Sequence, residues 1–283
     1  MKVIRAQALG MCFGVKDALN TIRSLESPGE VTVYGELVHN PRVLAEIESR
    51  GISQVGECER GPVPETSSVL ITAHGLSNLE RQRLVDAGKQ IIDTTCPLVR
   101  RVHAVACMLD RAGYFVIVIG RRDHVEVQGI IGDLNSCVVI SSLPEVRFIG
   151  KPRIGIVAQT TTPPAEADRI ASAIRDANPG SEIRWVNTVC RPTRERQEAA
   201  TVLLGQVEML VVVGGRHSNN TRQLVALAQS KGLPVQHVEH AGELDREALR
   251  TFRVVGLTAG TSTLDETIRD VEAALEAIPT LTD

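Results

Sequence analysis

Residues 93–97, Asp93-Thr94-Thr95-Cys96-Pro97, join a predicted strand to a predicted helix. The run Gln90-Ile91-Ile92 before them is typical of the end of a buried strand. Pro97 suits the first turn of a helix, where its missing N–H leaves no hydrogen bond unmade. Apolar residues then recur at helical spacing, at Val99, Val102, Ala106 and Leu109. Cys96 is therefore expected at the start of a helix, where backbone N–H groups favour a thiolate.

The same arrangement occurs twice more. Cys190 follows a predicted strand at 182–189 and precedes Arg191-Pro192, and Cys12 follows a predicted strand at 1–6. The three cysteines recur with a nearly constant period of roughly 90 residues, which is the signature of a repeated architecture. We therefore predict three α/β units, at residues 1–95, 96–189 and 190–283, with the three thiols converging on one point.

The rest of the chain alternates apolar strand-like runs with helical patterns. This order predicts an α/β fold with mainly parallel sheets. Two helices have the sequence of a capping box, in which a Ser or Thr hydroxyl and a Glu three residues later bond the first turn. The boxes are Ser77 with Glu80 and Thr263 with Glu266.

The composition argues against several classes of protein. The chain has 283 residues, a net charge of −3 and only 2% aromatic residues, so neither a basic surface nor a base-stacking platform for nucleic acid is expected. No apolar run approaches the length of a membrane helix. The chain begins directly with a strand pattern, which predicts a cytoplasmic protein without a signal peptide. Cysteines in that compartment more often bind metals or catalyse than form disulfides, although Cys107 and Cys137 fit as small core residues.

Polar side chains follow most of the predicted strands, where parallel α/β sheets bind their ligands. Helix starts at the same edge carry partial positive charge, which suits a phosphate or diphosphate. Glu126 is the only carboxylate of the set and is the natural proton donor. The set is His39, His74, His124, Glu126, Thr160, Ser218, Asn220 and Ser262.

Each of these residues also has a purely structural explanation. A single Cys or His at a strand end is commonly structural, and Ser and Asn favour helix caps. Three thiolates could hold zinc with one open position. They could equally hold a 4Fe–4S cluster with one iron free for substrate, and because the cysteines are dispersed their spacing does not choose between the metals.

The motifs together resemble those of the 4-hydroxy-3-methylbut-2-enyl diphosphate reductase family, and the resemblance covers essentially the whole chain. It rests on residues 10–15, 38–41, 73–75, 93–97, 124–127, 158–161, 187–190, 218–220 and 258–262. The chain departs from the common family pattern at Val125, Arg191, His217 and Asn219. Of these, Asn219 still supplies a hydrogen-bond donor.

The resemblance implies three α/β domains around one 4Fe–4S cluster held by Cys12, Cys96 and Cys190. It implies that Glu126 and Thr160 deliver a proton while the substrate's hydroxyl leaves as water. Ferredoxin or flavodoxin would deliver two electrons, and the allylic diphosphate substrate would become isopentenyl or dimethylallyl diphosphate. The substrate would be surrounded by His39, His74, His124, Thr160, Ser218, Asn219, Asn220 and Ser262.

Two alternatives remain at this point. One is another three-cysteine cluster enzyme of the quinolinate synthase kind, which would bind a dicarboxylate and an amine. The other is a metal- or phosphate-binding module without catalytic activity, which would hold a redox-silent metal.

Overall fold

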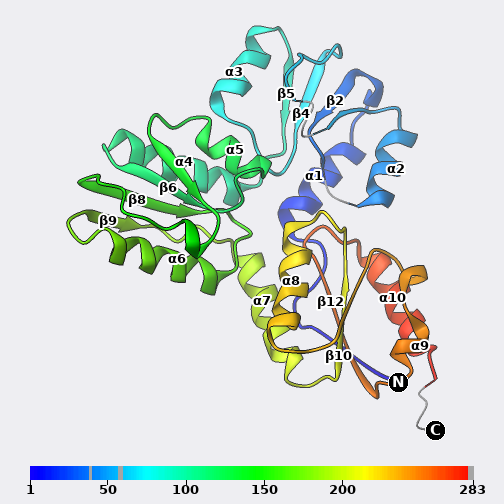
Figure 1. The fold of residues 1–283 in the computed structure, drawn as a ribbon. Helices are drawn as coiled ribbons and strands as arrows, with labels where there is room; N and C mark the ends of the chain where they lie inside the picture. Colours follow the sequence, from blue (N-terminus) through cyan, green and yellow to red (C-terminus); the bar gives the residue numbers. More distant parts are fainter. Residues whose placement is uncertain (38–39, 57–59, 280–283) are drawn as a thin grey trace. The chain divides into compact units, whose positions relative to one another are not determined.

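The structure, a computed structural model, describes residues 1–37, 40–56 and 60–279. Its strands form three sheets of four strands each, and every pairing is parallel (Figure 1). The predicted fold class is therefore confirmed.

The first two sheets are continuous in sequence and share one topology, in which the first strand lies between the second and the third and the fourth lies at an edge. The first sheet has the order β3-β2-β4-β5 and the second β7-β6-β8-β9. The strands are β2 (Val31–Tyr34), β3 (Ser53–Val55), β4 (Ser68–Ile71), β5 (Gln90–Asp93), β6 (Phe115–Ile119), β7 (Cys137–Ile140), β8 (Arg153–Ala158) and β9 (Glu182–Trp185).

The third sheet repeats this topology with a strand from the other end of the chain. It comprises β10 (Met209–Val213), β11 (Val235–Val238), β12 (Val254–Ala259) and β1 (Lys2–Arg5), in the order β1-β12-β10-β11. The N-terminal strand, which the sequence groups with residues 1–95, thus occupies the fourth position of the third sheet. The repeat is circular because the strand that precedes Cys12 completes the sheet begun after Cys190.

Ten helices connect and cover the strands. They are α1 (Phe13–Arg23), α2 (Pro41–Ser49), α3 (Asn78–Asp86), α4 (Pro97–Arg111), α5 (Val125–Ile131), α6 (Pro164–Ala177), α7 (Arg191–Leu204), α8 (Asn219–Ser230), α9 (Arg246–Leu249) and α10 (Asp265–Glu276). These ten belong to the part of the chain that the structure describes.

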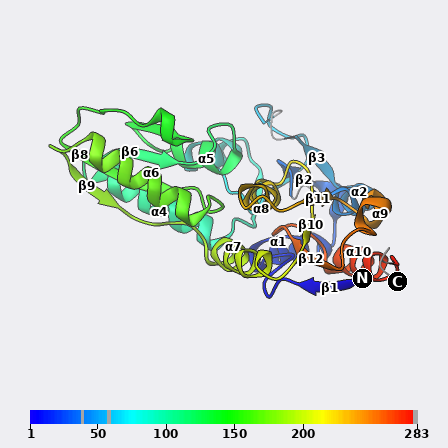
Figure 2. The same ribbon diagram turned by 60° about the horizontal axis from the view of Figure 1, so that its bottom comes forward.

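The second sheet illustrates why the strands are apolar throughout. Ile117 and Ile119 of β6 pack with α6 on one face, while Val116 and Val118 pack with α4 on the other (Figure 2). Successive side chains of a strand point to opposite faces, so a sheet covered on both faces needs apolar residues at every position. The helices therefore exclude water from both faces and leave the strand ends as the place for polar groups.

The two predicted capping boxes differ in outcome. Ser77 Oγ accepts a hydrogen bond from Glu80 N at 3.2 Å, which confirms the Ser77 half of the first box, while the Glu80 carboxylate accepts from Tyr34 Oη and Arg83. The prediction for Thr263 was wrong, because α10 begins after Leu264 without a side-chain cap. Thr263 Oγ1 instead donates to Val213 O at the end of β10, a carbonyl that also accepts from Gly260 N at 3.0 Å.

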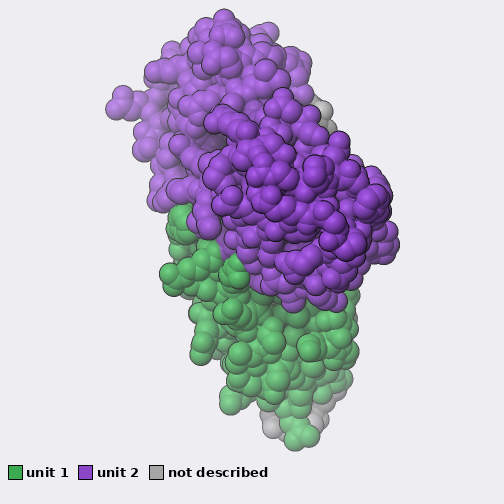
Figure 3. Space-filling view, turned by 90° about the vertical axis from the view of Figure 1, so that its left-hand side faces the viewer, with its two compact units in different colours: residues 1–16, 38–46, 191–283 green, residues 17–37, 47–190 purple. Residues whose placement is uncertain are grey.

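The chain divides into two compact units (Figure 3). Unit 1 comprises residues 1–16, 38–46 and 191–283 and contains the third sheet. Unit 2 comprises residues 17–37 and 47–190 and contains the first two. Among the helices described, none is both long and apolar enough to cross a membrane.

Candidate active site

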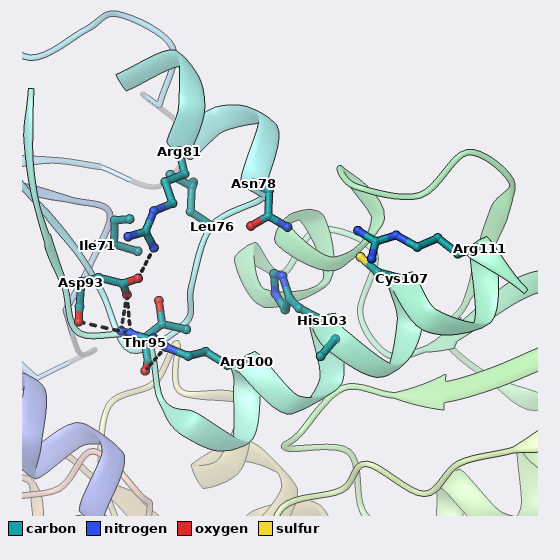
Figure 4. A pocket seen from close by; sticks show the side chains of 11 residues that line it. Ile71, Leu76, Asn78, Arg81, Asp93, Thr95, Arg100, His103, Cys107 and Arg111 are labelled. Carbon is teal, nitrogen blue, oxygen red and sulfur yellow. Dashed lines mark hydrogen bonds and ion pairs between the residues drawn. The ribbon is translucent and has the colours of Figure 1, made fainter. Parts of the chain in front are cut away.

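The segment that carries Cys96 is held in place by its own side chains and by α3. Asp93 Oδ1 accepts a hydrogen bond from Thr95 N at 3.0 Å, and Arg81 and Arg100 form ion pairs with the same carboxylate (Figure 4). Burial opposes ionisation of Asp93, but hydrogen bonds from Thr95 and Arg81 lower its pKa overall. A cavity of about 360 Å³ borders this segment on the side of Arg81 and Arg100. The carboxylate thus fixes the turn that delivers Cys96 to the start of α4.

One hydrogen bond recurs at all three candidate ligands. The backbone N–H of Cys96 donates to Ala73 O at 3.1 Å, that of Cys190 to Thr160 O at 2.9 Å and that of Cys12 to Thr261 O at 3.0 Å. In each case the acceptor lies just beyond the end of the neighbouring strand, β4, β8 or β12. The ladder between the fourth and third strands therefore continues to the cysteine, and each thiol is placed beside a strand end.

Each of those strand ends carries a residue predicted for the site. His74 follows Ala73, Thr160 is itself the acceptor for Cys190, and Ser262 follows Thr261. Each cysteine also precedes a helix, and Cys96 is the N-cap of α4. The repeated fold therefore brings a thiol and a polar side chain together three times.

Glu126 and Thr160 form a buried pair within unit 2. Glu126 lies in the first turn of α5 and is 1% exposed, and Thr160 follows β8 and is 4% exposed. Thr160 donates twice to the carboxyl group, from N to Oε1 at 2.7 Å and from Oγ1 to Oε2 at 2.9 Å. The hydroxyl can also accept, so this contact can carry a proton in either direction.

Burial raises the pKa of Glu126, because removal from water penalises the carboxylate. The two hydrogen bonds from Thr160 and the neighbouring His74 oppose this rise without cancelling it. A carboxyl group with a raised pKa stays protonated closer to neutral pH, as a general acid requires.

The two described candidate histidines lie side by side. The rings of His74 and His124 are 5.5 Å apart between centroids and meet edge to face. His124 is the N-cap of α5, and its Nδ1 accepts a hydrogen bond from Glu126 N at 3.1 Å. Since Nδ1 accepts here, neutral His124 carries its proton on Nε2. The backbone N–H of Glu126 thus orients the His124 ring through Nδ1. The carboxyl group of Glu126 is bound by Thr160 instead.

These contacts form one continuous chain inside unit 2. It runs from Cys96 through the Ala73–His74 turn to His124, then to Glu126 and Thr160, and ends at Cys190. Six residues predicted from five separate stretches of sequence are therefore linked in the structure.

The remaining described candidates lie in unit 1. Ser218 is the N-cap of α8, with Oγ accepting from Thr221 N at 3.4 Å, and Asn219 is the first residue of that helix. Asn220 Oδ1 accepts from Thr261 N at 3.2 Å, which directs its amide nitrogen away from that bond. Asn40 Nδ2 donates to Ser262 O at 3.5 Å. The strand ends of the third sheet thus hold a second cluster of donors.

Among the buried donors of unit 1 that have no hydrogen-bond partner in the described residues, two belong to predicted site residues. They are Asn220 Nδ2 and Ser262 Oγ, on side chains only 2% and 8% exposed. A buried polar group is normally paired, because leaving it unpaired costs about 1–3 kcal/mol. Both residues were predicted to bind an anion, and donors left open in this way fit phosphate oxygens.

The described cysteines fall into two groups. None of the five takes part in a disulfide: Cys12, Cys96, Cys107, Cys137 and Cys190. Burial raises the pKa of the Cys107 and Cys137 thiols, which disfavours their thiolate forms. In either unit taken alone, the described residues contain no group of three Cys, His, Asp or Glu side chains that could hold a metal.

His39 lies outside the described residues, so its predicted role stays a prediction. Two histidines that are not among the predicted site residues contact the backbone: His237 Nε2 lies 2.8 Å from Gly214 O, and His240 Nδ1 accepts from Gly242 N at 3.1 Å.

Together these features define a class: an α/β protein of three circularly repeated parallel sheets, each with a cysteine between its edge strand and a helix. Residues 3–276 match the family described as LytB protein, and the chain belongs to that family.

Individual relatives carry a more specific name. The chain is 34% identical to the 4-hydroxy-3-methylbut-2-enyl diphosphate reductase of Aquifex aeolicus, over 98% of this chain and 96% of the relative. A solved (E)-4-hydroxy-3-methyl-but-2-enyl diphosphate reductase, described as the terminal enzyme of the non-mevalonate pathway, is 35% identical. It has a TM-score of 0.68 and covers 98% of this chain and all of its own.

A second solved structure supports the fold alone. The E-1-hydroxy-2-methyl-but-2-enyl-4-diphosphate reductase from Plasmodium falciparum is 24% identical, with a TM-score of 0.86 over 96% of this chain and 87% of its own.

Proposed function

We propose that this protein is a 4-hydroxy-3-methylbut-2-enyl diphosphate reductase of the non-mevalonate isoprenoid pathway. The reaction breaks the C–O bond of the allylic alcohol, consumes two electrons and two protons, and yields water and isopentenyl or dimethylallyl diphosphate. The observation that carries the proposal is the buried Glu126–Thr160 pair, joined by backbone contacts to Cys190 in a chain of this family.

The proposed cofactor is one 4Fe–4S cluster held by Cys12 of unit 1 and by Cys96 and Cys190 of unit 2. The donor set fits, since each of these three cysteines lies outside any disulfide and precedes a helix next to a strand end, whereas burial disfavours the thiolate forms of Cys107 and Cys137. When bound, such a cluster supplies one-electron transfer, and a ferredoxin or flavodoxin is the proposed donor.

The diphosphate is proposed to bind the open donors of unit 1, Asn220 Nδ2 and Ser262 Oγ, with Ser218 and Asn219 at the N-terminus of α8. A helix N-terminus presents backbone N–H groups and partial positive charge to an anion. His39, His74 and His124 are proposed to contribute further hydrogen bonds to the substrate. Hydrogen bonds to a charged group are roughly twice as strong as neutral ones, so a few of these donors suffice to orient the substrate.

Glu126 is proposed to supply the proton for the leaving hydroxyl through Thr160. Hydroxide is a poor leaving group, so C–O cleavage needs a proton as the bond breaks. The Thr160 Oγ1 hydroxyl donates to Glu126 Oε2 and can take the proton from a protonated carboxyl while passing its own onward. Both side chains are almost completely buried, and this burial favours the protonated acid until the substrate accepts its proton.

The deciding experiment is anaerobic purification, followed by iron and acid-labile sulfide analysis and a turnover assay with reduced viologen and the allylic diphosphate. We expect iron and sulfide near four of each per chain and release of both isopentenyl and dimethylallyl diphosphate. Zinc without sulfide would favour the non-catalytic metal module instead. A cluster without turnover of the diphosphate would favour a reaction of the quinolinate synthase kind.

A further inference from the structure

A buried arginine holds the loop that carries Cys12. Arg196 lies on α7, two turns into the helix, and is 6% exposed. Its Nε and Nη2 both donate to Gly10 O, at 3.1 and 2.5 Å, and its Nη1 donates to Pro192 O at 3.0 Å. An arginine is seldom buried unless its guanidinium is well satisfied. This one directs three N–H groups to two backbone carbonyls.

The carbonyl that Arg196 holds belongs to a constrained residue. Gly10 has φ +76°, a left-handed conformation that side chains rarely adopt, and a Cβ there would lie 2.7 Å from Ile268 Cδ1. Gly10 N donates to Ala259 O at 3.2 Å, and Cys12 N donates to Thr261 O at 3.0 Å. The Gly10–Cys12 loop is thus held by β12 and α10 on one side and by Arg196 on the other.

Pro192, the second backbone acceptor of Arg196, lies close in sequence to another candidate ligand. It lies in the first turn of α7, two residues after Cys190 in the chain, while Gly10 lies two residues before Cys12. A single guanidinium therefore links the loop before one candidate ligand to the first turn of the helix after another.

We infer that Arg196 is a positioning residue that holds the Cys12 thiol in its ligating conformation. The inference rests on the proposed function only in naming Cys12 as a ligand. The rigid fork of the guanidinium can bond Gly10 O and Pro192 O at once, whereas a lysine presents a single nitrogen and cannot reproduce two N–H groups on one carbonyl with a third on another. Positioning the Cys12 loop therefore requires the branched guanidinium group of Arg196 as well as its positive charge.

The test compares Arg196→Lys and Arg196→Met with Arg246→Met, which removes an exposed arginine of α9 in the same unit. Apoprotein of each variant is treated with iodoacetamide, and the labelling rates of Cys12 and Cys96 are measured by peptide mass spectrometry. Cys96 lies in unit 2 and makes none of the contacts above, so it reports on general loosening of the fold. The ratio of the two rates isolates the Cys12 loop.

We expect the Cys12 to Cys96 ratio to rise about tenfold or more in both Arg196 variants, since each loses charged hydrogen bonds to the loop. Arg246→Met should leave the ratio unchanged. An unchanged ratio in Arg196→Lys would overturn the inference. A parallel rise of both labelling rates with a lower melting temperature would also overturn it, because that result is expected of a residue that only stabilises the fold. If Arg196→Met fails to fold, Arg196→Lys, which keeps the charge, decides alone.

A second measurement separates this inference from the proposed function. After anaerobic loading with iron and sulfide, the Arg196 variants should hold less cluster than Arg246→Met at equal thermal stability. If the wild-type protein takes up no cluster, the proposed function fails, while the labelling ratio still tests the positioning of Cys12. If an Arg196 variant took up a full complement of cluster although its Cys12 to Cys96 labelling ratio had changed, Cys12 would not need this loop conformation to act as a ligand.

Discussion

At the scale of single residues, Glu126 combines two environments that oppose each other. Burial favours its protonated form, and the two hydrogen bonds from Thr160 favour its ionised form. Burial is the larger effect, so the pKa is raised. Burial thus favours the protonated form of this side chain, while the hydrogen bonds from Thr160 stabilise the carboxylate that forms when the proton leaves.

Glu126→Gln tests the proton transfer directly. Glutamine keeps the shape of the side chain and its oxygen can still accept from Thr160 N, so cluster content and substrate affinity should stay near wild type. Turnover with reduced viologen should fall by about 10²–10⁴-fold, the usual contribution of a general acid. Iron content serves as the control, and near wild-type turnover at full loading would assign the proton to another source.

The raised pKa of Glu126 also makes stability depend on pH. The unfolded carboxyl ionises near its ordinary value of 4.5, whereas the folded one resists ionisation until higher pH. The stability that Glu126 contributes is therefore fully present below that ordinary value and is lost as pH rises through the folded pKa. In urea unfolding of apoprotein between pH 4 and 8, the free energy of unfolding of Glu126→Gln should increase relative to that of wild type as pH rises. Parallel curves would contradict the raised pKa.

At the scale of elements, α8 and α3 both begin with a serine N-cap, but they are proposed to differ in function. Ser218 Oγ caps α8 by accepting from Thr221 N, and Ser77 Oγ caps α3 by accepting from Glu80 N. Both serines are buried. The two caps therefore form a matched pair, of which only the first is proposed to bind diphosphate.

Ser218→Ala and Ser77→Ala should each lower the free energy of unfolding by about 1 kcal/mol, the usual cost of a lost cap. Only Ser218→Ala should also weaken binding of the allylic diphosphate, by about tenfold, because it removes a donor to a charged group. Calorimetric titration with the diphosphate measures this difference. Equal affinities in the two variants would leave Ser218 as a cap alone.

At the scale of the whole molecule, the fold is a threefold repeat closed by its own N-terminus. β1 pairs in parallel with β12, from Lys2 with Val254 to Arg5 with Leu257. Unit 1 is consequently built from three stretches of chain that are far apart in sequence. Its sheet combines β1 with three strands that follow more than two hundred residues later, between Met209 and Ala259.

The cysteines test the molecule as a whole, because the proposed ligands come from both units. Cys12→Ser, Cys96→Ser and Cys190→Ser should each lose most of the iron and all measurable turnover. Cys107→Ser and Cys137→Ser should keep both, since burial raises the pKa of each thiol and neither residue lies between an edge strand and a helix start. Iron analysis of anaerobic preparations checks this, and full iron content in any of the first three variants would remove that residue as a ligand.

The sequence by itself determined the alternation of elements and the place of each thiol. Apolar runs on strands buried on both faces are legible without a structure, and so is a proline after Cys96, because both depend on local chemistry. The polar residues at strand ends were also found this way, since parallel sheets gather such residues at one edge. Glu126 was singled out as the proton donor because it is the only carboxylate of that set, and the family resemblance added the role of Thr160.

Only the tertiary structure decided which partners those residues choose. β1 joins the third sheet because β12 offers it an open parallel edge, a long-range pairing that leaves no local signal. Thr263 Oγ1 donates to Val213 O at the end of β10, and α10 begins after Leu264 instead of being capped by Thr263. Arg196 stands in a charged stretch that is typical of a solvated helix face, yet it is buried and donates to Gly10 O. In each case the outcome depends on groups that lie fifty or more residues apart in the chain, where hydrogen bonding and burial outweigh local propensity.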